Sequence, residues 1–519
     1  MKKMGNLFAL ALSGVVSINV YAQSADTPAV DAAGAGGFGS GWGGFQMPAG
    51  GFQMPAGGFQ MLEGGFPGFG GFGGFGGFGG FGGFPGFGGM DQNLPPAVDM
   101  TTLPERSDDS GFTMVRDLKP KDGIPEAMKF ADGKEVSVSD WPKRAEEIAR
   151  MYEYYMYGVW PDRKGEKVSF DYDVASGQTM TIRIKRTSTD KEGVMHVTVR
   201  LPDASKNKMP EDGWPYIVAM HGGVQEQYAV EHGFAVFTLN TGEIASDDNR
   251  HRGMFYDLYP YGEDWKEQTG VLMAWAWGAS KVIDALEAGA DKVMKVNAAN
   301  SIVTGVSRWG KSTMVCGAFE KRFKMVVPSC SGTGGVAMFR YLSKGKTYDF
   351  SMLDGPASYT YGDNEQLHNL QTTGGQGWFN NKWCQFKDPK TLPFDQHMLC
   401  SLVADKDRYL FIIASCTGED WVNAPSMWMT YRADRAVFEK LGLGEHLACN
   451  VHLTGHAVTA EDMKYIVDYF RFHVYGEKPS LDLGKLTTSV FELPVNKDPL
   501  FDQFGGTVPK APEKNAETK

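Results

Sequence analysis

The chain has 519 residues and a formal net charge of −11, with 42% hydrophobic and 22% charged residues. An acidic chain without a basic stripe is not expected to bind nucleic acid, and it has no general attraction for acidic polymers. An acidic substrate would therefore have to be held by a few local cations.

Residues 1–22 have the pattern of a secretory signal peptide. Lys2 and Lys3 give a positive start, residues 7–20 form an apolar core too short to span a bilayer, and a small-residue cleavage site ends at Ala22. We predict a secreted or periplasmic protein that is cleaved after Ala22. No later stretch is long and apolar enough to predict a membrane span.

Residues 23–100 form a low-complexity region that is rich in Gly and Phe. Three copies of Gly-Gly-Phe-Gln-Met, at 43–47, 50–54 and 57–61, precede a Gly-Gly-Phe array. Glycine this dense cannot offset its ordering entropy by burying side chains. We predict a disordered tether, and the regular Phe residues leave weak self-association or surface attachment as an alternative role.

The predicted catalytic domain spans residues 101–490. A helix is expected over 144–157. Three segments with alternating polarity follow at 168–174, 180–185 and 194–201, and this pattern predicts antiparallel strands.

Continuous apolar runs then alternate with helical segments. Such runs are expected for strands buried on both faces of a sheet. The alternation predicts an α/β domain of three layers with a mostly parallel central sheet. The predicted buried strands are residues 216–220, 234–239, 301–304, 325–328, 409–414 and 447–453.

Two segments fall outside this alternation. The irregular stretch 332–394 is too long for an ordinary connection, and we expect it to supply part of a substrate cleft. The chain is polar from about residue 500, and we predict a flexible C-terminal tail over residues 491–519.

The six cysteines do not predict a metal site. Export permits disulfides, but no Cys-x-x-Cys or Cys/His metal spacing occurs. Buried free thiols are at least as well favoured as bridges, and we predict neither a metal nor another cofactor. The cysteines are Cys316, Cys330, Cys384, Cys400, Cys416 and Cys449.

The heptapeptide Gly-Val-Ser-Arg-Trp-Gly-Lys, residues 305–311, stands between a buried strand and a helix. A strand, a sharp turn with Ser at its tip and a helix form a nucleophile elbow, which presents the Ser hydroxyl above the sheet. The general pattern is Gly-x-Ser-x-Gly, whereas here Trp309 replaces the second Gly and Gly310 follows it. Ser307 is the candidate nucleophile, and a plain Gly-Ser turn is the alternative.

The remaining candidates follow later strands. Open α/β sheets carry their sites at the carboxyl ends of the strands, and Ser, acid, His is the chain order of the α/β-hydrolases. His456 is the predicted base because it lies between the last strand and the last helix. An acid should hold its imidazole in the correct tautomer.

The identity of the acid is open. Cys330 stands at the first candidate position, and a thiol cannot supply a permanent negative charge. The next strand end offers Glu419 and Asp420, for which solvated loop charges are the alternative. We favour Asp420 because it directly precedes Trp421, and we keep Glu419 as the second choice.

Two cations adjoin the nucleophile. Arg308 is the next residue, where a cation can stabilise an oxyanion beside backbone N–H groups. Lys311 lies one turn into the helix, where it can reach substrate hydroxyls or a carboxylate. Surface ion pairs are the alternative for both.

The heptapeptide resembles the Gly-Cys-Ser-Arg-x-Gly-Lys signature of the glucuronoyl esterases, carbohydrate esterase family fifteen, which are α/β-hydrolases. The resemblance extends over about residues 120–475. It includes the Trp-rich segment 274–280, Trp378-Phe379-Asn380, residues 392–399, and Gly455-His456 with residues 459–462.

The resemblance implies an exported serine esterase without a metal. Members cleave the ester between 4-O-methyl-glucuronic acid on xylan and lignin alcohols. Ser307 matches the nucleophile, His456 the base and Arg308 the oxyanion-stabilising Arg. Lys311 matches the Lys that binds the uronate sugar, and Trp421 an aromatic residue that lines the sugar site.

Two positions depart from the family pattern. Many members have Glu at the position of Cys330, whereas some bacterial members place the acid after the later strand, which favours Asp420 or Glu419. Val306 replaces a Cys of the fungal members, so their disulfide is not expected here.

The leading hypothesis is hydrolysis of glucuronoyl esters in glucuronoxylan. An acetylxylan or other carbohydrate esterase on the same fold is the second hypothesis, although a simple acetyl ester needs neither Arg308 nor Lys311. A non-catalytic carbohydrate-binding protein is the third, and the retained Ser307 and His456 argue against it. Fold alone justifies none of the three.

Overall fold

The computed structural model describes residues 100, 103, 105, 107–372 and 375–513. The chain divides into two units, Met1–Gly74 and Phe75–Lys519, and all described residues belong to the second unit. The predicted signal peptide and nearly all of the predicted Gly/Phe-rich tether lie outside the described residues.

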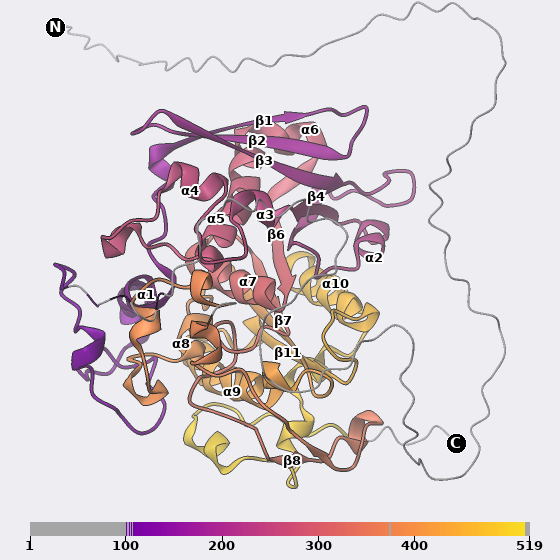
Figure 1. The fold of residues 1–519 in the computed structure, drawn as a ribbon. Coiled ribbons are helices and arrows are strands. Elements are labelled where there is room, and N and C mark those ends of the chain that lie inside the picture. The colour runs from indigo at the N-terminus through magenta and orange to yellow at the C-terminus, as the bar shows by residue number, and fades with distance from the viewer. Residues whose placement is uncertain (1–99, 101–102, 104, 106, 373–374, 514–519) are drawn as a thin grey trace, which may run out of the picture. The chain divides into compact units, whose positions relative to one another are not determined.

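A nine-stranded sheet forms the centre of the molecule, in the order β1-β2-β3-β5-β4-β6-β7-β10-β11 (Figure 1). The six strands from β5 to β11 pair in parallel, and β1, β2 and β3 continue the sheet with antiparallel pairing. The strands are β1 Glu166–Tyr172, β2 Thr179–Arg186, β3 Lys191–Arg200, β4 Trp214–Met220, β5 Ala235–Leu239, β6 Val296–Val306, β7 Met325–Ser329, β10 Tyr409–Ser415 and β11 Leu447–His452.

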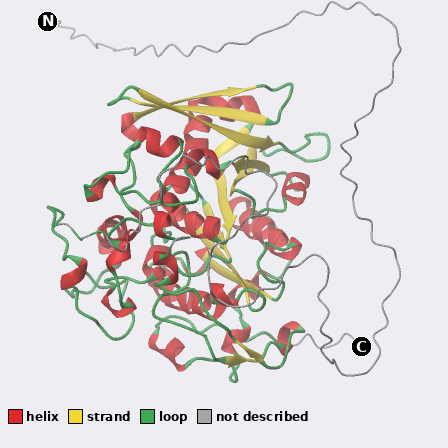
Figure 2. Ribbon diagram, in the orientation of Figure 1, coloured by secondary structure: helices red, strands yellow, loops and turns green. Residues whose placement is uncertain are grey.

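Helices cover both faces of this sheet, which gives the three predicted layers (Figure 2). One buried cluster joins the sheet to α1, α5, α7, α8 and α9, and a second joins its other face to α2 and α10. The helices are α1 Trp141–Tyr152, α2 Glu226–Glu231, α3 Thr241–Ile244, α4 Met254–Leu258, α5 Val271–Ala285, α6 Asp291–Met294, α7 Arg308–Phe319, α8 Gln396–Ser401, α9 Ala424–Lys440 and α10 Ala460–Tyr475.

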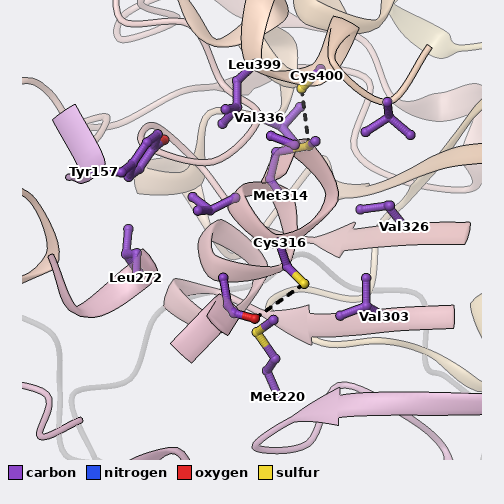
Figure 3. Close-up of a cluster of buried hydrophobic side chains, with 14 of the residues drawn as sticks. Tyr157, Met220, Leu272, Val303, Met314, Cys316, Val326, Val336, Leu399 and Cys400 are labelled. Atoms are coloured by element: carbon purple, nitrogen blue, oxygen red, sulfur yellow. Dashed lines mark hydrogen bonds between the residues drawn. The ribbon is translucent and has the colours of Figure 1, made fainter. Parts of the chain in front are cut away.

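Helix α7, which begins directly after Ser307, lies in the core. Figure 3 shows its Met314 and Cys316 among side chains of the sheet, such as Val303 and Val326, and of neighbouring helices, such as Leu272. Nine of the twelve residues of α7 are buried, from Gly310 to Ala318. This packing holds the elbow at a fixed place above the sheet.

The predicted α/β architecture is confirmed, including the switch from antiparallel to parallel strands. The alternating segments became β1–β3, whose burial alternates along each strand, while β4 is buried at every position. All six cysteines are free and buried, which is one of the two alternatives that the sequence left open. No helix of the described part has the length and apolarity that a membrane crossing requires.

The predicted flexible tail from residue 491 is wrong for its described part. Glu492 forms an ion pair with Arg432 of α9 at 2.5 Å, and both side chains are 2% exposed. Phe501 is buried, and its carbonyl oxygen accepts a hydrogen bond from the same guanidinium at 3.3 Å. A buried Arg requires a charged or polar partner. Which residue supplies that partner depends on the packing of the chain, so a polar composition does not reveal these few contacts.

The irregular stretch 332–394 contains a two-stranded hairpin, β8 Thr347–Tyr348 and β9 Tyr359–Thr360, and several short turns. Its polar side chains contact the start of α7 and the loop after β10, as described below. Its role in a substrate cleft stays a prediction.

Candidate active site

Four strands bring the predicted site residues to one edge of the sheet. Strands β6, β7, β10 and β11 are neighbours and run parallel, so their carboxyl ends meet. Val306 aligns with Ser329, and Ser329 with Ile413. The segments that follow these strands carry Ser307, Cys330 and the loops of Glu419 and His456.

Ser307 occupies a strained turn between β6 and α7. Its φ of 64° and ψ of −128° lie in a region that residues with a Cβ rarely adopt, at a cost of about 1–3 kcal/mol. Its N–H donates to the carbonyl oxygen of Ser329 at 3.1 Å, which fastens the turn to β7. This is the geometry predicted for a nucleophile elbow.

The displaced second glycine has a packing reason. A Cβ on Gly310 would lie 2.5 Å from the carbonyl oxygen of Ser329, and a Cβ on Gly305 would lie 2.7 Å from the carbonyl oxygen of Trp309. Trp309 has room for its ring, which stacks on His221 at 4.5 Å between centroids. The elbow therefore requires glycine at position 310 and tolerates an indole at 309.

Glu419 is the carboxylate that the structure places against His456. Its Oε2 lies 2.6 Å from His456 Nδ1, and its Oε1 accepts the N–H of Ser415 at 3.1 Å. The Glu419 side chain is fully buried, whereas that of His456 is 27% exposed. A carboxylate on Nδ1 favours the tautomer whose Nε2 is free to accept a proton.

The structure does not place Asp420, the favoured candidate, against His456. Asp420 Oδ1 accepts the hydroxyl proton of Tyr359 at 2.6 Å, and Oδ2 accepts the N–H of Gly362 at 2.8 Å. Asp420 begins a short helical turn, so its side chain leaves the loop in a different direction from that of Glu419. It fastens the segment around β9 to the loop of the acid instead of orienting the base.

Cys330 lies beside this pair. The thiol is buried, and burial raises its pKa well above the usual range, with the charge of Glu419 acting in the same direction. The candidate ligand atoms of Cys330, Glu419 and His456 lie within 4.8 Å of one another, the one such group of His, Cys and acidic residues found in the described part of the chain. A metal ion there would disrupt the contact between Glu419 and His456.

Arg308 is held beside the elbow by an acid from another loop. Its Nη1 lies 2.5 Å from Asp247 Oδ2, and both side chains are 29% exposed. The guanidinium carbon lies 5.7 Å from the ring centroid of Trp309 and 5.5 Å from that of Trp378. Its predicted role at an oxyanion stays a prediction.

Lys311 is buried and fully engaged. Its ammonium donates to Glu365 Oε2 at 2.6 Å and to the carbonyl oxygens of Ser331 at 2.7 Å and Thr333 at 2.8 Å. Burial lowers its pKa, and Glu365 opposes that shift. Since an ammonium has three protons, a substrate group would have to replace one of these acceptors.

Trp421 is the exposed aromatic side chain of the site. It is 39% exposed, and its ring centroid lies 5.2 Å from that of His456. An indole face beside the base is a suitable surface for an apolar sugar face. Its sugar-lining role stays a prediction.

The sequence analysis missed two acids that contact the site residues, Asp247 and Glu365, and it named Trp378 only within the resemblance, without a role. Asp247 is 61 residues from Arg308, and Glu365 is 54 residues from Lys311, so no local spacing connects them. One signal was given no role: His221-Gly222-Gly223 directly follows β4. A Cβ on Gly223 would lie 2.8 Å from the Cα of Gly305, so this loop touches the elbow where α/β-hydrolases place part of their oxyanion hole.

Comparisons with known proteins agree on one family. A family model for fungal glucuronyl esterase matches residues 184–442. The structure is similar to that of a carbohydrate esterase family 15 glucuronoyl esterase from Caldicellulosiruptor kristjansonii, with a TM-score of 0.66 and 37% identity, covering 75% of this chain and 97% of that one.

Two curated relatives are longer than the matched region. A multidomain esterase of Ruminococcus flavefaciens is 50% identical over 400 residues, which cover 76% of this chain and 51% of that protein. A 4-O-methyl-glucuronoyl methylesterase of Phanerochaete chrysosporium is 30% identical over 332 residues, covering 62% of this chain and 63% of that protein. The chain thus spans about half of the first relative and less than two thirds of the second.

Proposed function

The chain belongs to the glucuronoyl esterases of carbohydrate esterase family 15, and from this premise we propose that it hydrolyses the ester between 4-O-methyl-glucuronic acid side chains of glucuronoxylan and lignin alcohols. The observation that carries the proposal is the strained Ser307 at an edge of the sheet where His456 is bonded to the buried Glu419. The predicted signal peptide, residues 1–22, supports an enzyme that acts outside the cytoplasm, and residues 23–100 would form a tether.

The proposed first step is attack of Ser307 on the ester carbonyl. Its Oγ forms a bond to the carbonyl carbon while His456 Nε2 takes the hydroxyl proton. Glu419 stabilises the imidazolium through Nδ1. The alkoxide of the leaving alcohol then takes that proton, the carbon–oxygen bond breaks, and an acyl-enzyme remains.

The proposed second step is hydrolysis of the acyl-enzyme. Water gives a proton to His456 and attacks the carbonyl carbon, and the proton then returns to Ser307 as its ester bond breaks. The oxyanion of each step would be stabilised by backbone N–H groups at the start of α7 and by the guanidinium of Arg308. Lys311 and Trp421 would bind the sugar, with Glu365 beside Lys311.

The test compares a benzyl or methyl ester of glucuronic acid with acetylated xylan. We expect turnover of the glucuronate ester, unchanged by a chelator, and a loss of at least a thousandfold in Ser307→Ala. Turnover of acetylated xylan alone would assign an acetylxylan esterase. Binding of glucuronoxylan with no turnover of either substrate would assign the non-catalytic role.

A further inference from the structure

Asp247 contacts both Arg308 and Trp378, one of the two indole rings beside that guanidinium. Its Oδ2 pairs with the guanidinium, and its Oδ1 accepts the indole N–H of Trp378 at 2.6 Å. The Trp378 ring, only 8% exposed, faces the guanidinium at 5.5 Å. One carboxylate therefore sets both the direction of Arg308 and the ring against which it rests.

The two cations beside the nucleophile are each neutralised by one acid. Arg308 pairs with Asp247, and Lys311 pairs with Glu365. The Lys311 ammonium lies 5.9 Å from the same Trp378 ring, so the two cations share one aromatic neighbour. The four formal charges sum to zero, although the two cations alone would make the site strongly positive.

This balance matters for an esterase that acts on a uronate ester. The reacting carboxyl group is neutral in the substrate and becomes a carboxylate in the product, because a carboxylic acid ionises at neutral pH. An uncompensated guanidinium next to the reacting carbon would bind the product more tightly than the substrate. Binding energy spent on the product slows its release and limits turnover.

We propose that Asp247 is a positioning residue that sets the direction and net charge of Arg308, so that the site releases the glucuronate product while Arg308 still faces the reacting carbonyl. The inference rests on the proposed function. It assigns the discrimination between the ester substrate and the acid product to a carboxylate that is bonded to Arg308 and Trp378.

The test measures the affinity of the full chain for glucuronate and for glucuronamide, its neutral isostere, by calorimetry in a Ser307→Ala background. The inference predicts similar affinities for the two in this background. Adding Asp247→Asn should increase the affinity for glucuronate by about tenfold and leave the affinity for glucuronamide nearly unchanged. The effect is limited to this size because a partly exposed ion pair is screened by water. In the enzyme with Ser307 intact, Asp247→Asn should show early slowing of ester hydrolysis as glucuronate accumulates.

Asp248→Asn is the matched control. Asp248 lies in the same loop but pairs with Arg250 and Arg252. Its replacement should therefore leave the ratio of the affinities for glucuronate and glucuronamide unchanged. Trp378→Phe removes the indole donor and keeps the charge of Asp247. It should lower kcat through misdirected Arg308 without changing that ratio.

Three results would overturn the inference. They are an unchanged ratio in Asp247→Asn, an equal change in Asp248→Asn, and a change in Trp378→Phe as large as that in Asp247→Asn. Failure of the proposed function is distinct, since it would appear as a wild-type chain that does not turn over the glucuronate ester.

Discussion

The ends of β7 and β10 are neighbouring positions, and one carries a thiol where the other carries a carboxylate. The strands pair in parallel, and each leads into a residue near His456. The end of β7 carries the thiol of Cys330, and the loop after β10 carries the carboxylate of Glu419. The comparison shows that position in space decides which side chain meets the imidazole, because both strand ends present a side chain to it.

The two positions also differ electrostatically. Glu419 receives a hydrogen bond from the Ser415 N–H and contacts the His456 ring, and these groups stabilise a buried carboxylate. Cys330 is backed by the carbonyl oxygen of Ala457 at 3.9 Å, and burial raises its pKa, so the thiol stays neutral. We conclude that Glu419, after β10, supplies a charge beside the imidazole, whereas Cys330, after β7, fills space.

The largest effect is expected for Glu419→Gln. An amide at this position keeps the shape but carries no charge and can donate to Nδ1, which stabilises the wrong tautomer. We expect kcat on benzyl glucuronate to fall by about 10³- to 10⁴-fold with KM little changed. A fall of less than tenfold would show that Glu419 is not the acid.

The next effect tests whether the two strand ends are interchangeable. Adding Cys330→Glu to Glu419→Gln should recover at least about tenfold of the lost kcat, because the new carboxyl lies within reach of the same imidazole.

The pH profile of the double variant should be shifted. The burial that raises the pKa of the Cys330 thiol should also raise that of a carboxyl placed there. The acid works only when ionised, so the recovered kcat should be lost, as pH falls, at a higher pH than in the wild type. A recovered profile that coincides with that of the wild type would contradict this electrostatic argument.

Asp420→Asn should have a smaller effect than either change. It weakens the bonds to Tyr359 and to the Gly362 N–H, which hold the segment around β9 to the loop. We expect KM to rise by about three- to tenfold, with a stability loss of about 1–2 kcal/mol in thermal or urea unfolding. The matched variant Tyr359→Phe should change KM in the same direction, whereas a loss of kcat as large as that of Glu419→Gln would restore Asp420 as the acid.

Cys330→Ala should have the smallest effect. It removes a buried, neutral group, so we expect kcat to change less than about threefold and stability to fall by about 1 kcal/mol. Native enzyme should also resist inactivation by iodoacetamide at mildly alkaline pH, because a raised pKa leaves little thiolate to react. Rapid inactivation that Cys330→Ala abolishes would show that the thiol is reactive.

Much of the fold follows from local patterns. The alternating segments 168–174 and 180–185 became β1 and β2, and the continuous run 216–220 became β4, because the period of polarity reports which faces of a strand are buried. The flexible tail was mispredicted, because a single buried Phe501 and one counter-ion for Arg432 leave no periodic trace.

By itself, the sequence determined the three-layer α/β fold and the strand–turn–helix at Ser307, and it predicted His456 as the base, since each depends on a strand, a turn or chain order. Only the tertiary structure decided that Glu419 and not Asp420 meets His456, and that Asp247 and Glu365 neutralise Arg308 and Lys311. Adjacent side chains in a loop point in different directions, and ion pairs across more than fifty residues depend on packing. Neither can be obtained from spacing along the chain.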